Sequence, residues 1–160
     1  MANMNTTYAG LSLRNPFIIS SSGLTNSVDR IRRLDTLGAG AIVLKSLFEE
    51  QIAFFIQKTV SQNQSNSSYP EAMDYISNYT RDNEVSNYLN LIREGKSKLS
   101  IPLMASINCV SSSEWITFAK KIEEAGADAL ELNLFVLPYD PHKSGAQNEQ
   151  IYFDVAMAIV

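Results

Sequence analysis

The stretch DALELNLFVLPYDP, Asp128 to Pro141, decides the fold class of this chain. After Asp128, its first half is apolar except for one carboxylate, Glu131, and one amide, Asn133. Short apolar runs of this kind are typical of buried strands, which are usually apolar on both faces when the sheet is parallel. The stretch therefore predicts a buried strand over residues 129–134 that carries polar groups towards its carboxyl end.

Three further apolar runs precede this one, and they predict strands at 17–19, 41–44 and 102–107. Amphipathic runs alternate with them and predict helices that start near Val28, Asn83, Ser111 and Ile151. Gly38 and Gly126 end the first and third helices, and Ser111 with Glu114 forms a capping box. Four strand–helix units in this order predict an α/β fold with a parallel sheet.

The spacing is interrupted once, by a polar segment at about 47–82 that is rich in Asn, Ser and Tyr. We interpret this segment as a long insertion after the second strand, because loops of such length in compact domains usually form lids or disordered excursions. No catalytic role is assigned to it.

The composition excludes several classes of protein. A net charge of −4 with scattered basic residues argues against a nucleic-acid partner. Cys109 is the single cysteine, so no disulfide can form within the chain, as expected in a reducing compartment. No apolar run approaches the ~20 residues of a membrane span, and no signal peptide precedes the first strand. We therefore expect a cytoplasmic protein without a membrane partner.

Polar residues gather at the carboxyl ends of all four predicted strands. They are Ser20 to Gly23 after the first strand, Lys45 and Ser46 after the second, Ser106 and Asn108 at the third, and Glu131 and Asn133 in the fourth. Strand carboxyl ends converge on one site in parallel α/β folds, and above all in (β/α)8 barrels. A cation, two amides and several hydroxyls together suit an electron-rich heterocycle with alternating carbonyls and ring nitrogens.

These residues make the chain resemble the dihydroorotate dehydrogenase family, whose members are FMN-containing (β/α)8 TIM barrels. The matching stretches are LSLRNPFIISSSG (11–23), GAGAIVLKS (38–46), IPLMASINCVSSSEW (101–115) and ADALELNL (127–134). The resemblance implies that residues 1–160 are the N-terminal half of a single FMN-binding barrel domain, with about four of its strand–helix units. It also implies a pyrimidine-like substrate and the oxidation of dihydroorotate to orotate in pyrimidine biosynthesis.

The resemblance assigns roles to individual residues. It implies FMN contacts for Ser21, Ser22, Gly23, Lys45, Ser46, Asn108 and Asn133, and substrate contacts for Lys45 and Asn133. Glu131 is expected to be held by neighbouring strands inside the barrel. No metal ligand is expected, because no cluster of His, Cys and carboxylates has the spacing of a metal site.

The chain departs from the family immediately after ELNL. The family continues with a Cys or Ser that removes a proton from dihydroorotate, whereas here Phe135, Val136 and Leu137 follow, with Val136 at the usual position of the base. None of these three can accept a proton, so the catalytic base is unknown. Three nearby side chains are weak candidates for a replacement: Tyr139, Asp140 and His142.

Length is the second departure, because a barrel of this type needs ~250 residues. We expect either a piece or an incomplete record of a longer protein, or two half-barrels that assemble as a homodimer. The full-length protein would then be a flavin oxidoreductase of the dihydroorotate dehydrogenase type, and the isolated 160-residue chain would be inactive. Two alternatives stay open: an FMN barrel that acts on a different substrate, and a non-catalytic barrel fragment that serves as an assembly partner.

Overall fold

The computed structural model describes residues 3–48, 70–108, 112–135 and 137–159. Its main sheet is parallel and contains β3 (Ile18–Ile19), β4 (Ala41–Val43), β5 (Leu47–Phe48), β6 (Leu103–Asn108) and β7 (Ala129–Leu132). β4 and β5 follow one another along one edge of β6, and β7 pairs with the other edge. In space the order is therefore the order of the sequence: β3, then β4 with β5, then β6, then β7.

Helices separate the strands, as the sequence predicts. A short 3-10 helix, η1 (Gly23–Thr25), and α1 (Val28–Thr36) follow β3; α3 (Pro70–Lys98) precedes β6; α4 (Ser112–Glu124) and α5 (Gly145–Ile159) flank β7. The α/β prediction is confirmed, and the alternating parallel units are consistent with part of a TIM barrel. Within the described stretches, no helix combines the length and apolar character that crossing a membrane requires.

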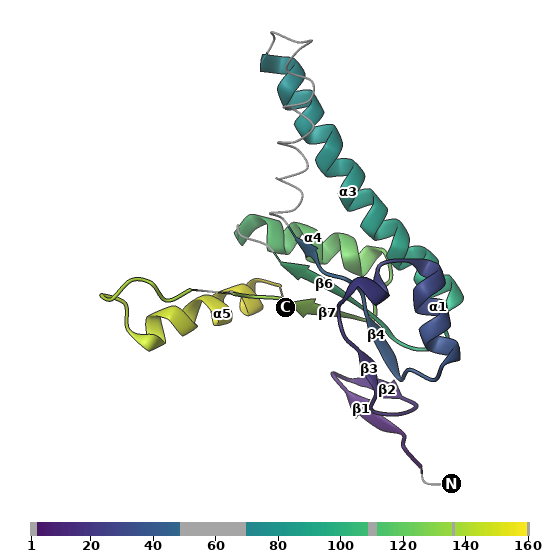
Figure 1. Cartoon of the computed structure of the whole chain (residues 1–160). Helices are drawn as coiled ribbons and strands as arrows, with labels where there is room; N and C mark the ends of the chain where they lie inside the picture. Colours follow the sequence, from purple (N-terminus) through teal and green to yellow (C-terminus); the bar gives the residue numbers. More distant parts are fainter. Residues whose placement is uncertain (1–2, 49–69, 109–111, 136, 160) are drawn as a thin grey trace.

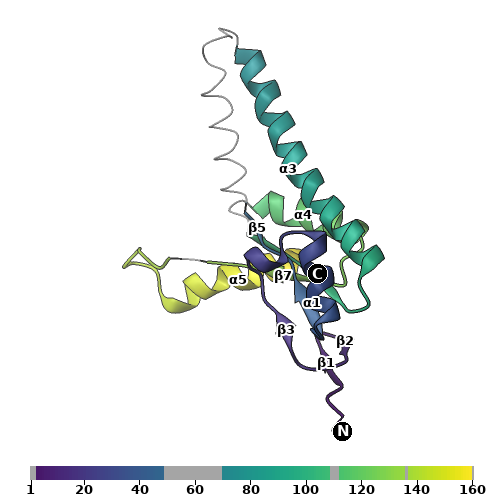
Figure 2. The same ribbon diagram turned by 45° about the vertical axis from the view of Figure 1, so that its right-hand side comes forward.

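Several features differ from the sequence-based expectation. An antiparallel hairpin of β1 (Thr6–Tyr8) and β2 (Leu11–Leu13) precedes the sheet, where no strands were predicted. The helix α3 begins at Pro70 rather than near Asn83, so it takes in the end of the predicted insertion and extends well beyond the sheet (Figures 1 and 2). Proline suits the first turn of a helix, because it needs no hydrogen-bond partner for a backbone N–H there. Ser111 of the predicted capping box lies outside the described residues.

The two faces of the sheet pack against different elements. One face meets α1, α3 and α4 in the larger core, with Ile42, Leu103 and Ile107 from the strands fully buried against the helices (Figure 1). The other face packs Ala41, Val43 and Met104 against Leu13 of the hairpin. The hairpin therefore covers the amino-terminal half of this second face, while the residues further along β6 and β7 belong to its carboxyl-terminal half.

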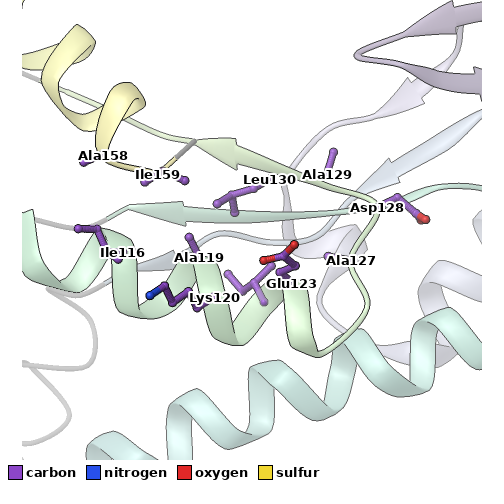
Figure 3. Close-up of a pocket in the computed structure, with 11 residues that line it drawn as sticks. Ile116, Ala119, Lys120, Glu123, Ala127, Asp128, Ala129, Leu130, Ala158 and Ile159 are labelled. Atoms are coloured by element: carbon purple, nitrogen blue, oxygen red, sulfur yellow. The ribbon is translucent and has the colours of Figure 1, made fainter.

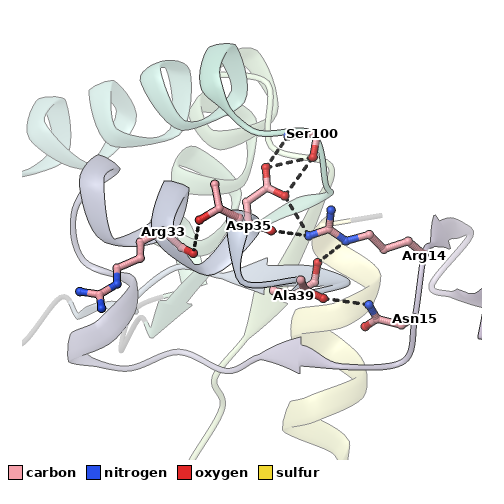
Figure 4. A network of polar contacts seen from close by, with 8 residues as sticks. Arg14, Asn15, Arg33, Asp35, Ala39 and Ser100 are labelled. Atoms are coloured by element: carbon pink, nitrogen blue, oxygen red, sulfur yellow. Dashed lines mark hydrogen bonds and ion pairs between the residues drawn. The ribbon is translucent and has the colours of Figure 1, made fainter.

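A hydrogen-bonded cluster joins four segments at the amino-terminal end of the sheet (Figure 4). Arg14 donates from Nε to the carbonyl of Ala39 at 2.8 Å and from Nη2 to the carboxylate of Asp35 at 2.9 Å. Ser100 donates its backbone N–H and its hydroxyl to the same carboxylate, at 2.8 and 2.9 Å. Burial acts to raise the pKa of Asp35, but the bonds from Ser100 and the charge of Arg14 outweigh it, so the pKa is lowered.

Replacing Asp35 with asparagine is expected to cost ~1–3 kcal/mol of unfolding free energy at neutral pH, the usual cost of lost charge-assisted hydrogen bonds. A carboxyl whose pKa is lowered by folding stabilises the fold above its unfolded pKa of ~4. That contribution disappears as the pH falls through the lower, folded pKa, so the wild type should lose more stability in acid than Asp35→Asn does. Urea unfolding at neutral and acidic pH, with Glu124→Gln on the exposed side of α4 as control, measures the difference. Equal acid sensitivity in Asp35→Asn and wild type would contradict this role.

Gly40 stands where two backbone segments approach closely. Its N–H donates to the carbonyl of Phe17 at 2.8 Å, and a Cβ at this position would collide with the backbone of Asn15. The side chain of Asn15 is itself fixed, since it donates to the carbonyl of Gly38 and accepts from the N–H of Phe17. The segment that leads into β3 therefore cannot move away from Gly40 without breaking these bonds.

Gly40→Ala is accordingly expected to destabilise the fold by ~1–3 kcal/mol, as overpacking against a fixed neighbour does. Gly145→Ala is the matched control, because nothing lies within 4 Å of a Cβ built at the start of α5. Thermal unfolding of both variants tests the claim. A Gly40→Ala variant as stable as Gly145→Ala would show that the segment leading into β3 can shift freely.

Candidate functional site

A β-bulge lies between β4 and β5, at the predicted site residues Lys45 and Ser46. Val43 is paired with Met104 and Leu47 with Ile107, so four steps along the one strand match three steps along β6. One extra residue is therefore inserted, which is rare in parallel pairs and frequent next to active sites. Because Leu44 and Leu47 both pack towards the helix side, the bulge leaves Ser46 free to join the opposite face of the sheet.

The hydroxyl of Tyr88 fills the gap that this bulge opens. The backbone N–H of Ser106 donates to the Tyr88 hydroxyl at 2.9 Å, and the hydroxyl donates to the Ser106 carbonyl at 3.0 Å. In a parallel ladder both groups of Ser106 would pair with the neighbouring strand. Tyr88 thus anchors α3 to the sheet beside the predicted site, and burial is the main reason that the pKa of Tyr88 is raised.

Four side chains form a continuous hydrogen-bonded row across four strands, which we call the serine relay: Ser21, Ser46, Ser106 and Glu131. The Ser21 and Ser46 hydroxyls are 3.1 Å apart, and those of Ser46 and Ser106 are 2.6 Å apart. Ser106 donates to Oε1 of Glu131 at 2.6 Å. Glu131 is thereby held by the neighbouring strand, as the sequence predicts, while Ser46 and Ser106 are buried.

The two asparagines of the predicted site lie together at the ends of β6 and β7. Nδ2 of Asn108 donates to the backbone carbonyl of Asn133 at 2.7 Å, and the N–H of Asn133 donates to the carbonyl of Ile107 at 2.9 Å. The carbonyl oxygen of Asn108 has no partner among the described residues. Asn133 is exposed, with its amide available at the strand end.

Lys45 lies in the bulge between β4 and β5, next to Ser46 in the chain. Its Nζ is 5.9 Å from the centre of the Phe48 ring, and Phe48 is paired with Asn108 across β5 and β6. A cation at this distance from an aromatic face is held by the ring quadrupole. Lys45 and Ser46 also line a cavity of about 250 Å³ that reaches Asn26 and the α3 residues Glu84 and Asn87.

Ser22 and Gly23 form the turn after β3. Ser22 is the N-cap of η1, and its hydroxyl accepts from the N–H of Leu24 at 3.2 Å. No atom lies within 4 Å of a Cβ built on Gly23. The turn therefore leaves open space beside Gly23, where a ligand could approach the backbone closely.

The candidate replacement bases lie in the segment after β7. Tyr139 is 85% exposed, and the carboxylate of Asp140 accepts from the backbone N–H of His142 at 2.9 Å. His142 is exposed as well. Val136 and Cys109 both lie outside the described residues.

A second cavity, of about 350 Å³, lies between α4, β7 and α5 (Figure 3). Apolar side chains such as Ile116, Leu130 and Ile159 line it, together with Lys120 and Glu123. None of the predicted site residues contributes to its lining, and Leu130 points to the helix side of the sheet. We therefore place the candidate site at the strand ends and not in this cavity. Among the described residues, no group of three His, Cys, Asp or Glu side chains could hold a metal ion.

Sequence reasoning missed Tyr88 as part of the site, and it did not foresee the contacts of Ser106. Ser106 appeared only as one polar residue in an apolar strand, and nothing in the sequence indicated that it links Ser46 to Glu131. In the sequence, Tyr88 is one position within the amphipathic run that predicts a helix starting near Asn83. The one signal available was its hydroxyl, because a buried tyrosine usually needs a polar partner.

Comparison with known proteins supports the family resemblance, although no protein-family profile matches the chain. The catalytic subunit of dihydroorotate dehydrogenase B (NAD(+)) from Thermoplasma volcanium is 29% identical over 147 residues, covering 91% of this chain and 44% of the relative. A putative dihydroorotate dehydrogenase A (fumarate) from Aeropyrum pernix is 31% identical over 149 residues, covering 89% and 43%. The NAD-dependent dihydropyrimidine dehydrogenase subunit PreA of Escherichia coli K12 is 25% identical over 151 residues, covering 90% and 35%.

The resemblance to the dihydroorotate dehydrogenase family is therefore confirmed along most of the chain. The chain spans less than half the length of the curated relatives it matches.

Proposed function

Because the chain resembles the dihydroorotate dehydrogenase family over about nine tenths of its length, we propose that it forms part of an FMN-dependent oxidoreductase acting on a small pyrimidine-like ring. The observation that carries the proposal is the row of polar groups at the carboxyl ends of β3, β4, β6 and β7. The four strand–helix units, with the long insertion after the second strand, contribute to one flavin-binding barrel domain. Homodimerisation and a cytoplasmic location belong to the same proposal.

The side chains at the strand ends suit a flavin ring. Lys45 offers a cation, and Asn133 offers an amide with a donor and an acceptor. Nδ2 of Asn108 is bonded to the Asn133 carbonyl, and its carbonyl oxygen has no partner among the described residues. The open space over Gly23 admits a planar ring close to the backbone. These groups match a heterocycle with alternating carbonyls and nitrogens, which is what the isoalloxazine ring presents.

The residues of the chain would bind and orient rather than transfer electrons. When bound, the flavin supplies the hydride-accepting chemistry of the reaction. Lys45 would stabilise negative charge that develops on the ring, because a cation preorganised at the charge favours it strongly in a partly desolvated site. Asn133 would fix the position of flavin and substrate together, and Ser21, Ser22 and Ser46 would hold the edge of the ring.

Two kinds of reduced pyrimidine are candidate substrates. Dihydroorotate is supported by the names of the Thermoplasma and Aeropyrum relatives. A different dihydropyrimidine is supported by the name of the Escherichia coli relative and by Phe135, Val136 and Leu137, which replace the proton-accepting residue of the family motif.

Anaerobic reduction of the bound flavin discriminates the two candidates. The native protein, loaded with FMN, is mixed with dihydroorotate or with dihydrouracil, and bleaching of the flavin absorbance is followed. Bleaching by dihydroorotate alone supports the first candidate, and bleaching by dihydrouracil alone supports the second. A flavin that neither compound reduces would contradict the proposed substrate class.

A further inference from the structure

The direction of every hydrogen bond in the serine relay follows from its last member. Ser106 donates to Glu131 at 2.6 Å. A serine hydroxyl has a single hydrogen, so Ser106 has none left for Ser46, and Ser46 must donate to Ser106 across their 2.6 Å contact. Ser46 in turn has none left for Ser21, so Ser21 must donate to Ser46 across 3.1 Å.

The outer end of the relay is therefore left without a hydrogen to offer. The Ser21 hydroxyl gives its hydrogen to Ser46 and accepts the backbone N–H of Ser46 at 2.9 Å. One lone pair of Ser21 remains, since a hydroxyl oxygen has two. Ser21 is half-buried, so its hydroxyl is partly accessible, and this lone pair is the group that a ligand would meet.

The inner end of the relay is fixed in place from two sides. The Tyr88 hydroxyl accepts from the N–H of Ser106 at 2.9 Å and donates to its carbonyl at 3.0 Å. The Ser106 hydroxyl donates to Glu131. Ser106 is fully buried, so water does not compete for its hydrogen. A buried chain of hydrogen bonds with one fixed end transmits that orientation along its length.

We propose that Glu131 is a positioning residue that orients the serine relay, so that Ser21 and Ser46 offer only hydrogen-bond acceptors to a ligand at the strand ends. The ligand group that meets them is consequently an N–H or O–H donor. Lys45, which precedes Ser46 in the chain, is donor-only. The site thus accepts a ligand with a donor on its Ser21 side and a carbonyl or anionic oxygen on its Lys45 side.

The orientation itself can be observed without any ligand, by a joint neutron and X-ray structure of the perdeuterated protein. We expect deuterium on the Ser21 oxygen directed at Ser46, on the Ser46 oxygen directed at Ser106, and on the Ser106 oxygen directed at Glu131. Deuterium directed from Ser46 to Ser21, or from Ser106 to Ser46, would overturn the proposal.

The consequence for binding rests on the proposed function and uses FMN as the probe. Ser106→Thr keeps the hydroxyl and Ser106→Val has the same shape without it, so this pair isolates the hydrogen bond. FMN should bind to Ser106→Val roughly tenfold more weakly than to Ser106→Thr, the cost of about one hydrogen bond, because Ser46 and Ser21 can then turn their hydrogens towards the ligand donor. Equal dissociation constants in the two variants would overturn the proposal.

Glu131→Leu removes the acceptor at the inner end of the relay and tests the same step, in case valine at the buried position 106 prevents folding. We expect a similar loss of FMN affinity there and none in Glu124→Leu, which changes an exposed glutamate on α4. Unchanged affinity in Glu131→Leu counts against the relay. A wild-type protein that binds no FMN contradicts the proposed function instead, and the deuterium positions then decide on the relay alone.

Discussion

Replacing Lys45 with methionine is expected to lower the turnover of the FMN-loaded protein by roughly 10²–10³-fold, the usual effect of removing one group that stabilises developing charge. Methionine keeps most of the length of the side chain and its contact with Phe48, but it has no charge. The loss should therefore fall mainly on the rate of flavin reduction, and less on FMN affinity. Stopped-flow reduction by the active substrate measures this rate directly.

Lys121→Met is the matched control, because Lys121 is an exposed lysine in the last turn of α4, away from the strand ends. It should reduce the flavin at the wild-type rate. If Lys45→Met also keeps the wild-type rate, then Lys45 is an ordinary strand-end charge and has no part in the chemistry.

Replacing Tyr88 with phenylalanine is expected to cost ~2–4 kcal/mol of unfolding free energy, although it removes a single oxygen atom. That oxygen serves both the N–H and the carbonyl of Ser106, at 2.9 and 3.0 Å. Because the bulge between β4 and β5 leaves these groups without a strand partner, both would become buried and unpaired, at ~1–3 kcal/mol each. Urea unfolding gives the loss, and amide hydrogen exchange at Ser106 should accelerate in the variant.

Tyr8→Phe in the hairpin is the control for this prediction, since Tyr8 is 56% exposed and should tolerate the change. The raised pKa of Tyr88 adds a signature in alkali. A tyrosine that is harder to ionise when folded stabilises the fold below its unfolded pKa of ~10, and this contribution is lost as the pH rises towards the folded value. Tyr88→Phe should lack that alkaline loss. A variant as stable as Tyr8→Phe would show that water replaces the hydroxyl at no cost.

The strands were predictable because their apolar runs are short, separated and ordered in strand–helix units. β6 and β7 lie where the apolar residues of 102–107 and 129–134 indicated. Strands of a parallel sheet are covered on both faces, so they appear in the sequence as nearly continuous apolar runs. The hairpin β1–β2 was missed because its first strand is fully exposed and has no apolar alternation to reveal it. The early start of α3 was missed because 70–82 is polar, and composition alone favoured an insertion there.

The site was predictable only in its outline. The polar strand ends placed Ser21, Ser46, Asn108 and Asn133 correctly at one end of the sheet, since parallel strands share their carboxyl ends. The bulge, in contrast, depends on a one-residue difference in pairing between two strands that are about 60 residues apart in the chain. Neither the insertion of the Tyr88 hydroxyl nor the link from Ser46 to Glu131 can be deduced without that register.

The two ends of the sheet carry different polar groups. At the amino-terminal end, Asp35 is bonded to Arg14 and Ser100, and Lys96 forms an ion pair with Asp128 at 2.7 Å. The carboxyl-terminal end carries the amides, the lysine and the serine relay. In (β/α)8 folds, residues at the carboxyl ends of the strands usually form the active site, whereas residues at the amino ends contribute to stability.

The most direct test of the account is the binding of FMN by the native protein, followed by quenching of flavin fluorescence and by the visible flavin spectrum. We predict stoichiometric binding with a perturbed flavin spectrum, weakened by Asn133→Ala and unaffected by Lys121→Met. A native, folded protein that leaves the fluorescence and spectrum of added FMN unchanged would contradict the assignment of the strand-end residues to a flavin site.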